Sequence, residues 1–454
     1  MYKASNGKFR RVHDARARPG KGCCCLNDCL HKGPNLIATI LHVLLGFRKH
    51  KYGYSADIEK AFPTVVIAPE HRDLLRCLWV EGDKVVVYRF ARLPFGLCCS
   101  PYLLSATLRK HMGDNCVSED LMSQFIGGVY MDDLVLSEKT VPDMRSKKDY
   151  ISQLFGQCGM RFRDLNTNHE SSQKLFADVE EKNVSELVEQ LVLGMKWDTK
   201  GDTVRANTDR LKKKISKDIK TKRDMWKIIP SLFDPMGLLS PFCLLGKKII
   251  MEACQEVKNL DSKMPQKFID KLKKWAEEFS SIENITWPRF AGIENPTKVE
   301  LYGCCDASDY AMGGCIYLVS TDSQGKIHSN LVLGKTRNKP SNIHTTPRLE
   351  LTSAVLLTNM MEHVQKVYQV APENIHFFSD SSIVIDWLYS GDTSFKPFVA
   401  NAIKKILKKS IVNNWHHISG KENPADLASR GAKIQNLLES DLWKHGPKIG
   451  RAHV

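Results

Sequence analysis

The sequence contains no apolar run long enough to cross a membrane. A spanning helix needs about 20 consecutive apolar residues, and the best candidate, Leu36–Leu45, is short and interrupted by His42. No charged segment followed by an apolar run stands at the N-terminus, so we expect no secretory signal and no membrane partner. Internal repeats and low-complexity segments are also missing. These absences exclude repeat architectures and favour globular domains.

The sequence also lacks the cysteine spacing of a disulfide framework. Several of the 14 cysteines are direct neighbours: Cys23–Cys25, Cys98–Cys99 and Cys304–Cys305. This scatter is typical of a reducing compartment. Cys25, Cys29 and His31 resemble metal ligands, but no second pair follows at the spacing of a zinc site, so we expect no zinc.

Positive charge is in excess. The 454 residues include 66 Lys and Arg against 51 Asp and Glu, a formal charge of +15. Neutralisation of phosphates by Lys and Arg drives sequence-independent nucleic-acid binding, so the excess suggests a polyanionic substrate. Charge alone leaves simple solubility as an equal alternative. The length allows two or three domains, each with its own core.

The pattern of elements is mixed. In the first 135 residues strand-like runs alternate with helical ones, for example a strand at Lys84–Phe90 and a helix at Pro101–Met112. Residues 140–230 are charged, and we interpret them as mostly helical. Ser231–Pro241 carries two prolines and a glycine, a break before an amphipathic helix at 243–257.

Three carboxylates in the first part suggest a metal site. Asp132 and Asp133 stand between apolar, β-rich flanks in Gly128–Ser137, which predicts a hairpin with both acids at its tight turn. Asp57 ends an apolar run upstream. Adjacent acids repel unless a cation offsets them, and magnesium prefers such oxygen ligands. Turns favour Asp for their own reasons, so the pair alone does not decide.

Between these acids, Arg92–Tyr102 contains a Pro-Phe-Gly-Leu loop that opens a helix, where Gly96 would allow close backbone approach to a nucleotide. The order of Asp57 with Phe62, this loop, and the Tyr-Met-Asp-Asp hairpin at Tyr130–Asp133 resembles the palm of reverse transcriptases. Taken by itself, Phe62 favours ordinary core packing.

Other segments resemble the Pol polyprotein of Bel/Pao-type LTR retrotransposons: Lys8–Ala15, Leu26–Asp28, Gly33–Pro34, Leu193–Trp197 and Phe233–Pro241. The resemblance implies that Arg10 or Arg11 contacts the nucleotide triphosphate. It implies that Phe62 excludes ribonucleotides and that Phe95 and Gly96 form part of the nucleotide pocket. Leu193–Trp197 resembles the primer-grip hairpin of that family.

A second α/β pattern begins at Lys298, after the proline-containing segment Asn284–Thr297, and carries four more acids. Their expected positions are a strand end, a first helical turn, a second strand end and a short helix, in the order Asp306, Glu350, Asp380 and Asp426. Each acid taken alone favours a helix cap or a solvated surface group over a catalytic role. The order resembles the ribonuclease H fold, whose acids hold two metal ions.

The same resemblance implies a histidine that assists product release, either His416 or His417, and simple packing is at least as good an interpretation of both. We interpret Gly313–Gly314 as the turn of the first hairpin of this domain.

The predicted fold class is therefore α/β (α+β): a right-hand polymerase with palm, fingers, thumb and connection region, followed by a ribonuclease H-like domain. The predicted boundaries are these: 1–140 for partial fingers and palm, 141–230 for the end of the palm and a thumb-like helical region, 231–295 for the connection, 296–435 for the ribonuclease H-like domain, and 436–454 for a tail leading toward an absent integrase.

The expected function is RNA-directed DNA polymerase with ribonuclease H (endonuclease) activity, using two Mg²⁺ or Mn²⁺ ions per active site. Expected partners are RNA template, DNA primer, RNA–DNA hybrid and dNTPs, and expected localisation is intracellular, in cytoplasmic virus-like particles with nuclear access. No protease motif and no integrase zinc module occur. The alternative is a catalytically inactive, nucleic-acid-binding remnant of a decayed or domesticated element. We expect the nuclease to be the activity that survives, because residues 296–435 look complete.

Overall fold

The computed structural model describes residues 2–3, 9–10, 13–116, 118–172, 189–217, 219–343, 345–391 and 395–448. The chain divides into two compact units. The first comprises Met1–Val43, Tyr54–Leu136 and Thr140–Val184, and the second comprises Leu44–Gly53, Ser137–Lys139 and Ser185–Val454. Within the described residues, no helix is long and apolar enough to span a membrane.

The first unit is built around a four-stranded sheet in the order β6-β7-β3-β8. Its strands are β3 (Tyr52–Ile58), β6 (Val129–Tyr130), β7 (Asp133–Glu138) and β8 (Phe162–Thr167). The helices of this part are α1 (Leu26–Cys29), the first half of α2 (Ile40–Phe47), α3 (Ala61–Thr64), α4 (Ser100–Asn115), α5 (Glu119–Gly128) and α6 (Val141–Gly156), and the second half of α2 belongs to the second unit. Phe125 and Phe155 stack at 4.8 Å between α5 and α6, which ties these helices together.

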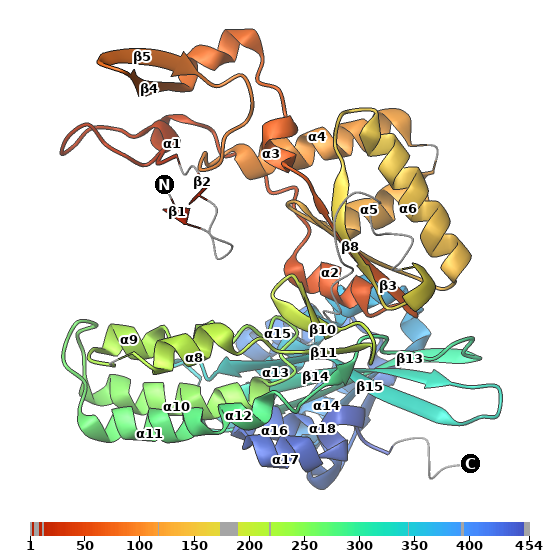
Figure 1. The fold of residues 1–454 in the computed structure, drawn as a ribbon. Coiled ribbons are helices and arrows are strands. Elements are labelled where there is room, and N and C mark those ends of the chain that lie inside the picture. The colour runs from red at the N-terminus through yellow and green to blue at the C-terminus, as the bar shows by residue number, and fades with distance from the viewer. Residues whose placement is uncertain are drawn as a thin grey trace. The chain divides into compact units, whose positions relative to one another are not determined.

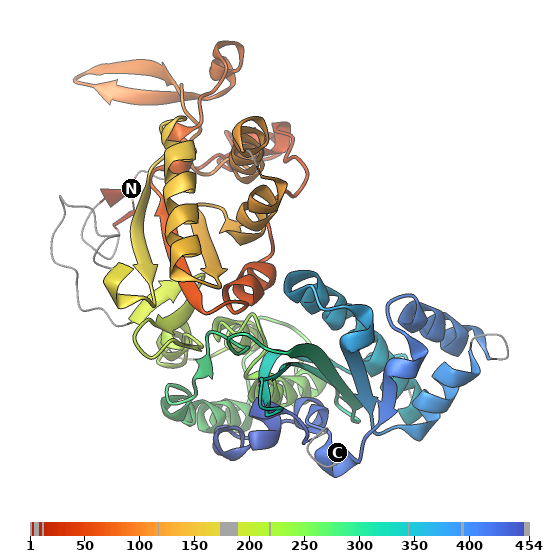
Figure 2. The same ribbon diagram turned by 90° about the vertical axis from the view of Figure 1, so that its right-hand side faces the viewer.

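A two-stranded ribbon, β4 (Arg76–Glu81) and β5 (Lys84–Arg89), follows the 3₁₀ helix η1 (Pro69–Leu74). Both views show the ribbon standing clear of the four-stranded sheet (Figures 1 and 2). One of its faces carries aliphatic side chains that are 59–70% exposed: Leu78, Val80, Val85 and Val87. A short pairing of β1 (Tyr2–Lys3) with β2 (Phe9–Arg10) precedes these elements.

The second unit begins with a smaller sheet in the order β12-β11-β10-β9. Its strands are β9 (Glu189–Val192), β10 (Met195–Asp198), β11 (Thr203–Arg205) and β12 (Trp287–Pro288). Leu193 and Gly194, with φ of 46° and 87°, form the two-residue turn between β9 and β10. Positive φ at both central positions is the pattern of a type I′ turn, which suits a tight hairpin.

A group of helices belongs to the same part of the chain. They are α8 (Asp209–Ile215), α9 (Lys222–Trp226), η2 (Ile229–Ser231), α10 (Ser240–Glu256), α11 (Gln266–Glu277) and α12 (Phe279–Ile282). α10 and α11 lie side by side (Figure 1). Their contact is aromatic, since Phe242 and Trp275 stack at 4.9 Å.

The largest sheet has five strands in the order β15-β14-β13-β16-β17. The strands are β13 (Lys298–Ala307), β14 (Ala311–Thr321), β15 (Ile327–Asn338), β16 (Ile375–Ser379) and β17 (Trp415–His417). β13 pairs antiparallel with β14 and parallel with β16. The associated helices are α13 (Thr346–Tyr368), α14 (Ser382–Ser390), α15 (Pro397–Leu407), α16 (Ala425–Arg430), α17 (Ile434–Glu439) and α18 (Asp441–His445), with 3₁₀ turns η3 (Pro372–Asn374), η4 (Val412–Asn414) and η5 (Gly420–Glu422).

The core beside this sheet also contains side chains from segments that are distant from its strands in the sequence. Trp443 of α18 is fully buried, and its indole Nε1 donates to the carbonyl of Leu238, 2.9 Å away. The hydroxyl of Thr336 on β15 donates to the carbonyl of Ala428 in α16 at 2.7 Å. The segment just before α10 and the helices α16 and α18 therefore pack as parts of one core with the five-stranded sheet.

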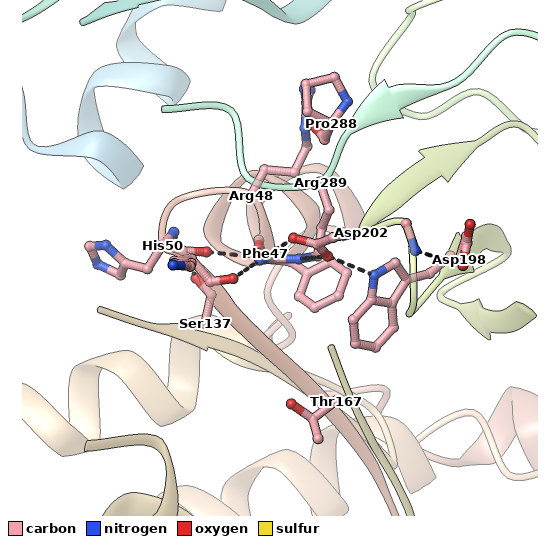
Figure 3. Close-up of polar contacts among 12 residues, drawn as sticks. Phe47, Arg48, His50, Ser137, Thr167, Asp198, Asp202, Pro288 and Arg289 are labelled. Carbon is pink, nitrogen blue, oxygen red and sulfur yellow. Dashed lines mark hydrogen bonds and ion pairs between the residues drawn. The ribbon is translucent and has the colours of Figure 1, made fainter. Parts of the chain in front are cut away.

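Arg289 is the centre of a polar cluster inside the second unit (Figure 3). Its guanidinium is fully buried, pairs with Asp202 at 2.7 Å, and donates to the carbonyls of Phe47 and His50 at 2.5 and 2.9 Å. The indole of Trp197 also donates to Asp202, at 3.1 Å. Arg289 lies in the proline-containing segment 284–297. This segment therefore contains β12 and a buried guanidinium that is paired with a carboxylate and hydrogen-bonded to backbone carbonyls.

Most expected elements are confirmed. The predicted strand at 84–90 is β5, the helix at 101–112 is α4, and the helix at 243–257 is α10. The interpretation of residues 140–230 as mostly helical is wrong in part, because β8 to β11 lie there. On β10 and β11 buried side chains alternate with partly exposed ones, and β8 carries the adjacent charged residues Arg163 and Asp164, so charge density alone did not reveal these strands.

The assignment of Gly313 and Gly314 to a hairpin turn is also wrong. Both lie inside β14, opposite Asp306 and Cys305, and the turn is instead at residues 308–310. A Cβ on Gly313 would lie 2.7 Å from the carbonyl oxygen of Ala425. The glycine is needed because α16 packs directly on the strand there.

Candidate active sites

Asp57 stands near the end of β3, one of the two central strands of the first sheet. The pairing of β3 with β8 shifts register between Ser55 and Asp57, an irregularity of the kind that re-aims a side chain. Oδ2 of Asp57 accepts from Nε of Arg163 on β8 at 2.9 Å. The guanidinium is a partner that sequence reasoning missed.

Asp132 and Asp133 lie at the turn between β6 and β7, as expected. Tyr130 pairs with Asp133, which leaves Met131 and Asp132 as the two turn residues. Met131 has a φ of 59°, an uncommon conformation for a non-glycine residue and one that often marks a functional site. The amide of Ile58 donates to the carbonyl of Asp132 at 2.8 Å, so the turn lies against the end of β3 beside Asp57.

The electrostatics of these three acids show that they crowd one another. Burial raises the pKa of Asp133 to about 6, and the charges of Asp132 and Asp57 add to the shift. The pKa of Asp57 is raised as well, mainly by burial, although Arg163 opposes the shift. Partly buried carboxylates that repel one another are an environment in which a cation is favourable.

Phe62, Phe95 and Gly96 come together beside this sheet. Phe62 of α3 contacts Phe95 edge-on with ring centroids 5.1 Å apart, and Phe95 is 49% exposed. Gly96 has a φ of 101°, and a Cβ there would lie 2.5 Å from the carbonyl oxygen of His13. The side chain of Asn27 holds this loop by donating to the carbonyl of Gly96 at 3.0 Å and accepting from the amide of Cys98 at 2.8 Å.

The two arginines predicted to contact the triphosphate are not placed by the structure. Arg10 is described only as a backbone position in β2, and Arg11 lies outside the described residues. Their role stays a prediction.

The second group of acids gathers at one end of the five-stranded sheet. Asp306 and Asp380 stand at the carboxyl ends of the parallel strands β13 and β16, where Cys305 pairs with Ser379. The hydroxyl of Ser381 donates to Oε2 of Glu350 in α13 at 2.6 Å, which brings that helix to the same edge. The structure thus brings the two strand ends and this helix together, but the expectation that Glu350 lies in the first helical turn is wrong, because α13 begins at Thr346 and Glu350 is its fifth residue.

Asp426 joins this group through α16. The hydroxyl of Ser429 donates to Oδ2 of Asp306, and the guanidinium of Arg430 pairs with Oδ1 of Asp426. The side chain of Asn423 donates to the carbonyl of Cys305 at 3.0 Å, which anchors the start of the helix beside β13. Sequence reasoning missed these polar residues, since only the packing of α16 on β13 reveals them.

Burial also governs the titration of this group. Asp306 is 4% exposed, and burial raises its pKa to about 6 against the hydrogen bond from Ser429, while Asp380 and Asp426 raise it further. Burial likewise raises the pKa of Asp380, with a further contribution from Asp426. A buried acid among other acids is costly when ionised, so this edge also favours a cation.

The two candidate histidines differ in their surroundings. Nε2 of His416 lies 3.3 Å from Nδ1 of His376, and burial lowers the pKa of His416. His417 is exposed, and its charge lowers the pKa of Asp380. The role of either histidine in product release stays a prediction.

The donor set of both groups fits divalent cations, because it consists of carboxylate oxygens whose mutual repulsion a cation would offset. As the side chains stand, no three His, Cys, Asp or Glu groups among the described residues are arranged to hold an ion. Several of the acids instead accept hydrogen bonds from protein side chains. Asp57 accepts one from Arg163, and Glu350 accepts one from Ser381.

The fold is that of a reverse transcriptase with a ribonuclease H-like domain. Three similar solved structures are foamy viral protease–reverse transcriptases, in complex with an RNA/DNA hybrid (13% identity, TM-score 0.53), with double-stranded DNA as the dRH form (15%, 0.58), and with double-stranded DNA (15%, 0.55). The matches cover 85%, 92% and 92% of this chain and 46%, 64% and 75% of those chains. The chain thus spans about half to three quarters of their length, and at this identity the likeness concerns the fold.

Residues 221–381 match the family model described as the Pao retrotransposon-like RNaseH-like domain. No curated protein matches the chain. For this part of the chain, the family match confirms the resemblance to Bel/Pao-type Pol polyproteins.

Proposed function

We propose that the chain is an RNA-directed DNA polymerase with ribonuclease H activity. The observation that supports this proposal most is that distant segments bring carboxylates together at two separate places. In each group, burial and neighbouring acids raise the pKa of one carboxylate, Asp133 or Asp306, to about 6. Such shifts cluster at functional sites.

In the first unit, Asp57, Asp132 and Asp133 would hold two divalent ions, Mg²⁺ or Mn²⁺. In the second unit, Asp306, Glu350, Asp380 and Asp426 would do so. Bound there, the ions would activate the attacking hydroxyl or water and stabilise the leaving oxygen. The partners proposed are an RNA template, a DNA primer, dNTPs and an RNA–DNA hybrid.

The chain's own residues have separate roles in this proposal. Phe62 and Phe95 would contact the sugar and base of the incoming nucleotide. Gly96 would let the protein backbone come close to that nucleotide. Arg163 would orient Asp57. In the nuclease site, Ser381 and Ser429 would hold Glu350 and Asp306 in place between catalytic events, and His417 would lie beside the product phosphate.

The test is digestion of a labelled RNA–DNA hybrid with Mg²⁺, with primer extension on the same preparation. We expect hybrid-specific cleavage that Asp380→Asn abolishes while extension persists, and extension that Asp133→Asn abolishes while cleavage persists. A folded protein that binds hybrid with strong salt dependence and performs neither reaction would instead be the inactive binding remnant. The basic charge of +15 supports nucleic-acid binding in either case.

A further inference from the structure

A cationic and aromatic group lies directly beside the acids of the second unit and has no part in the functions assigned so far. It consists of Lys248 on α10, Tyr310 in the turn between β13 and β14, and Arg430 at the end of α16. We call these three residues the basic rim. They come from three segments that only the packing of α10 and α16 on the sheet brings together.

Lys248 connects the other two members. Its Nζ donates to the carbonyl of Arg430 at 2.5 Å and lies over the ring of Tyr310, 4.3 Å from the centroid. Tyr310 is 52% exposed, so the ring beneath the Lys248 ammonium is open to solvent. Among the described residues, Lys248 forms no ion pair with a carboxylate.

Arg430 contacts one of the acids directly. Its guanidinium pairs with Asp426 from one turn further along the same helix, and its side chain is 65% exposed. A divalent ion bound to Asp426 would compete with Arg430 for the carboxylate of Asp426, which now neutralises the guanidinium. In that state two adjacent cations and an exposed aromatic ring would face outward beside the acids.

We propose that the basic rim binds a backbone phosphate of the strand being cut, next to the phosphate that the acids attack. Lys and Arg are the side chains that neutralise polynucleotide phosphates, and Arg does so with a planar, multidentate donor set. An exposed aromatic ring beside them offers a surface for a sugar or base. This inference rests on the proposed nuclease, and it adds a residue of α10 to its substrate site.

The test uses the full chain carrying Asp380→Asn, so that the hybrid stays intact, and measures binding of a labelled RNA–DNA hybrid over a range of KCl with Mg²⁺ present. We expect Lys248→Gln and Arg430→Gln each to raise the Kd about three- to tenfold. Each should also lower the slope of log K against log salt by about 0.7–0.9, the loss of one phosphate contact.

The matched control is Lys366→Gln. Lys366 is on α13, about 24 Å along the helix from Glu350, and its side chain is 64% exposed and paired with Glu362. The control removes the same charge from the same unit and should change neither the Kd nor the slope. Equal effects in Lys366→Gln and the two rim variants would overturn the proposal.

Conservative variants separate phosphate binding from a structural role. Lys248→Arg and Arg430→Lys keep the charge and should retain the salt slope, and Tyr310→Phe should bind as the parent does while Tyr310→Ala binds more weakly. If Lys248→Arg loses binding as fully as Lys248→Gln, the lysine acts through its hydrogen bond to α16 and the proposal is wrong.

The outcome also separates this inference from the nuclease proposal. If the chain with native Asp380 cuts no hybrid and the rim variants still weaken binding, the nuclease fails and the rim stands. If the native chain cuts hybrid with the same KM in all rim variants, the nuclease stands and the rim fails.

Discussion

Asp306 shows how a single residue couples stability to function. Its carboxylate is nearly inaccessible, accepts a hydrogen bond from Ser429, and lies near the charges of Asp380 and Asp426. The pKa is raised from 3.8 to about 6, so the folded protein holds the proton more tightly than the unfolded chain. The free energy of unfolding must therefore fall as the pH rises from about 4 to about 6, and the loss is complete above that range.

This fall in the free energy of unfolding with rising pH leads to a prediction for Asp306→Asn in the absence of metal ions. In EDTA at pH 7.5 the variant should be more stable than the native chain by about 1–3 kcal/mol, because the buried charge is gone. At pH 4 the difference should largely vanish. Thermal unfolding at the two pH values measures it, and a variant less stable than the native chain at pH 7.5 would contradict the prediction. Added Mg²⁺ should raise the Tm of the native chain more than that of the variant.

At the scale of elements, the contact between β14 and α16 decides where Asp426 and Ser429 stand. Gly313 leaves room for the backbone of α16, whereas Gly314, the next residue, faces the flexible side chain of Met360 on α13. The two glycines are adjacent in sequence but face opposite sides of the sheet.

Gly313→Ala should therefore be more harmful than Gly314→Ala. The added Cβ would lie 2.7 Å from backbone atoms of Ala425 and Ser429, so α16 must move and carry Asp426 away from Asp306. We expect a loss of about 1–3 kcal/mol in stability and a large loss of hybrid cleavage. Gly314→Ala meets Sδ of Met360 at 3.1 Å, which can yield. Equal unfolding temperatures and cleavage rates for the two variants would show that α16 is not held there.

At the scale of the whole molecule, the residues expected to form a tail toward an absent integrase contain part of the core. Trp443 has no exposed surface, and the hydroxyl of Tyr317 donates to its carbonyl oxygen at 3.1 Å. α18 also packs on the edge strand β15.

A chain that ends at residue 435 should thus be less stable than one that ends at residue 448. The loss of one fully buried tryptophan alone costs about 3–5 kcal/mol. Thermal unfolding followed by circular dichroism measures the difference, and Trp443→Phe in the longer chain should show a smaller loss. Identical unfolding of the two truncated chains would mean that α18 contributes nothing to the core.

The sequence by itself determined the local features of this protein. The apolar, β-rich flanks of Asp132 and Asp133 predicted their hairpin, and Thr346 and Pro347 predicted the start of α13, because these signals depend on neighbours within a few residues. The order of acids and motifs along the chain predicted the fold class through its resemblance to reverse transcriptases and ribonucleases H.

Only the tertiary structure decided which distant groups meet. The pairing of Asp306 with Ser429, the cluster at Arg289, the burial of Trp443 and the approach of Lys248 to Arg430 all join segments far apart in the chain. Each depends on which faces of helices and strands pack together. Local periodicity says that a face is apolar, but it does not say which other face covers it.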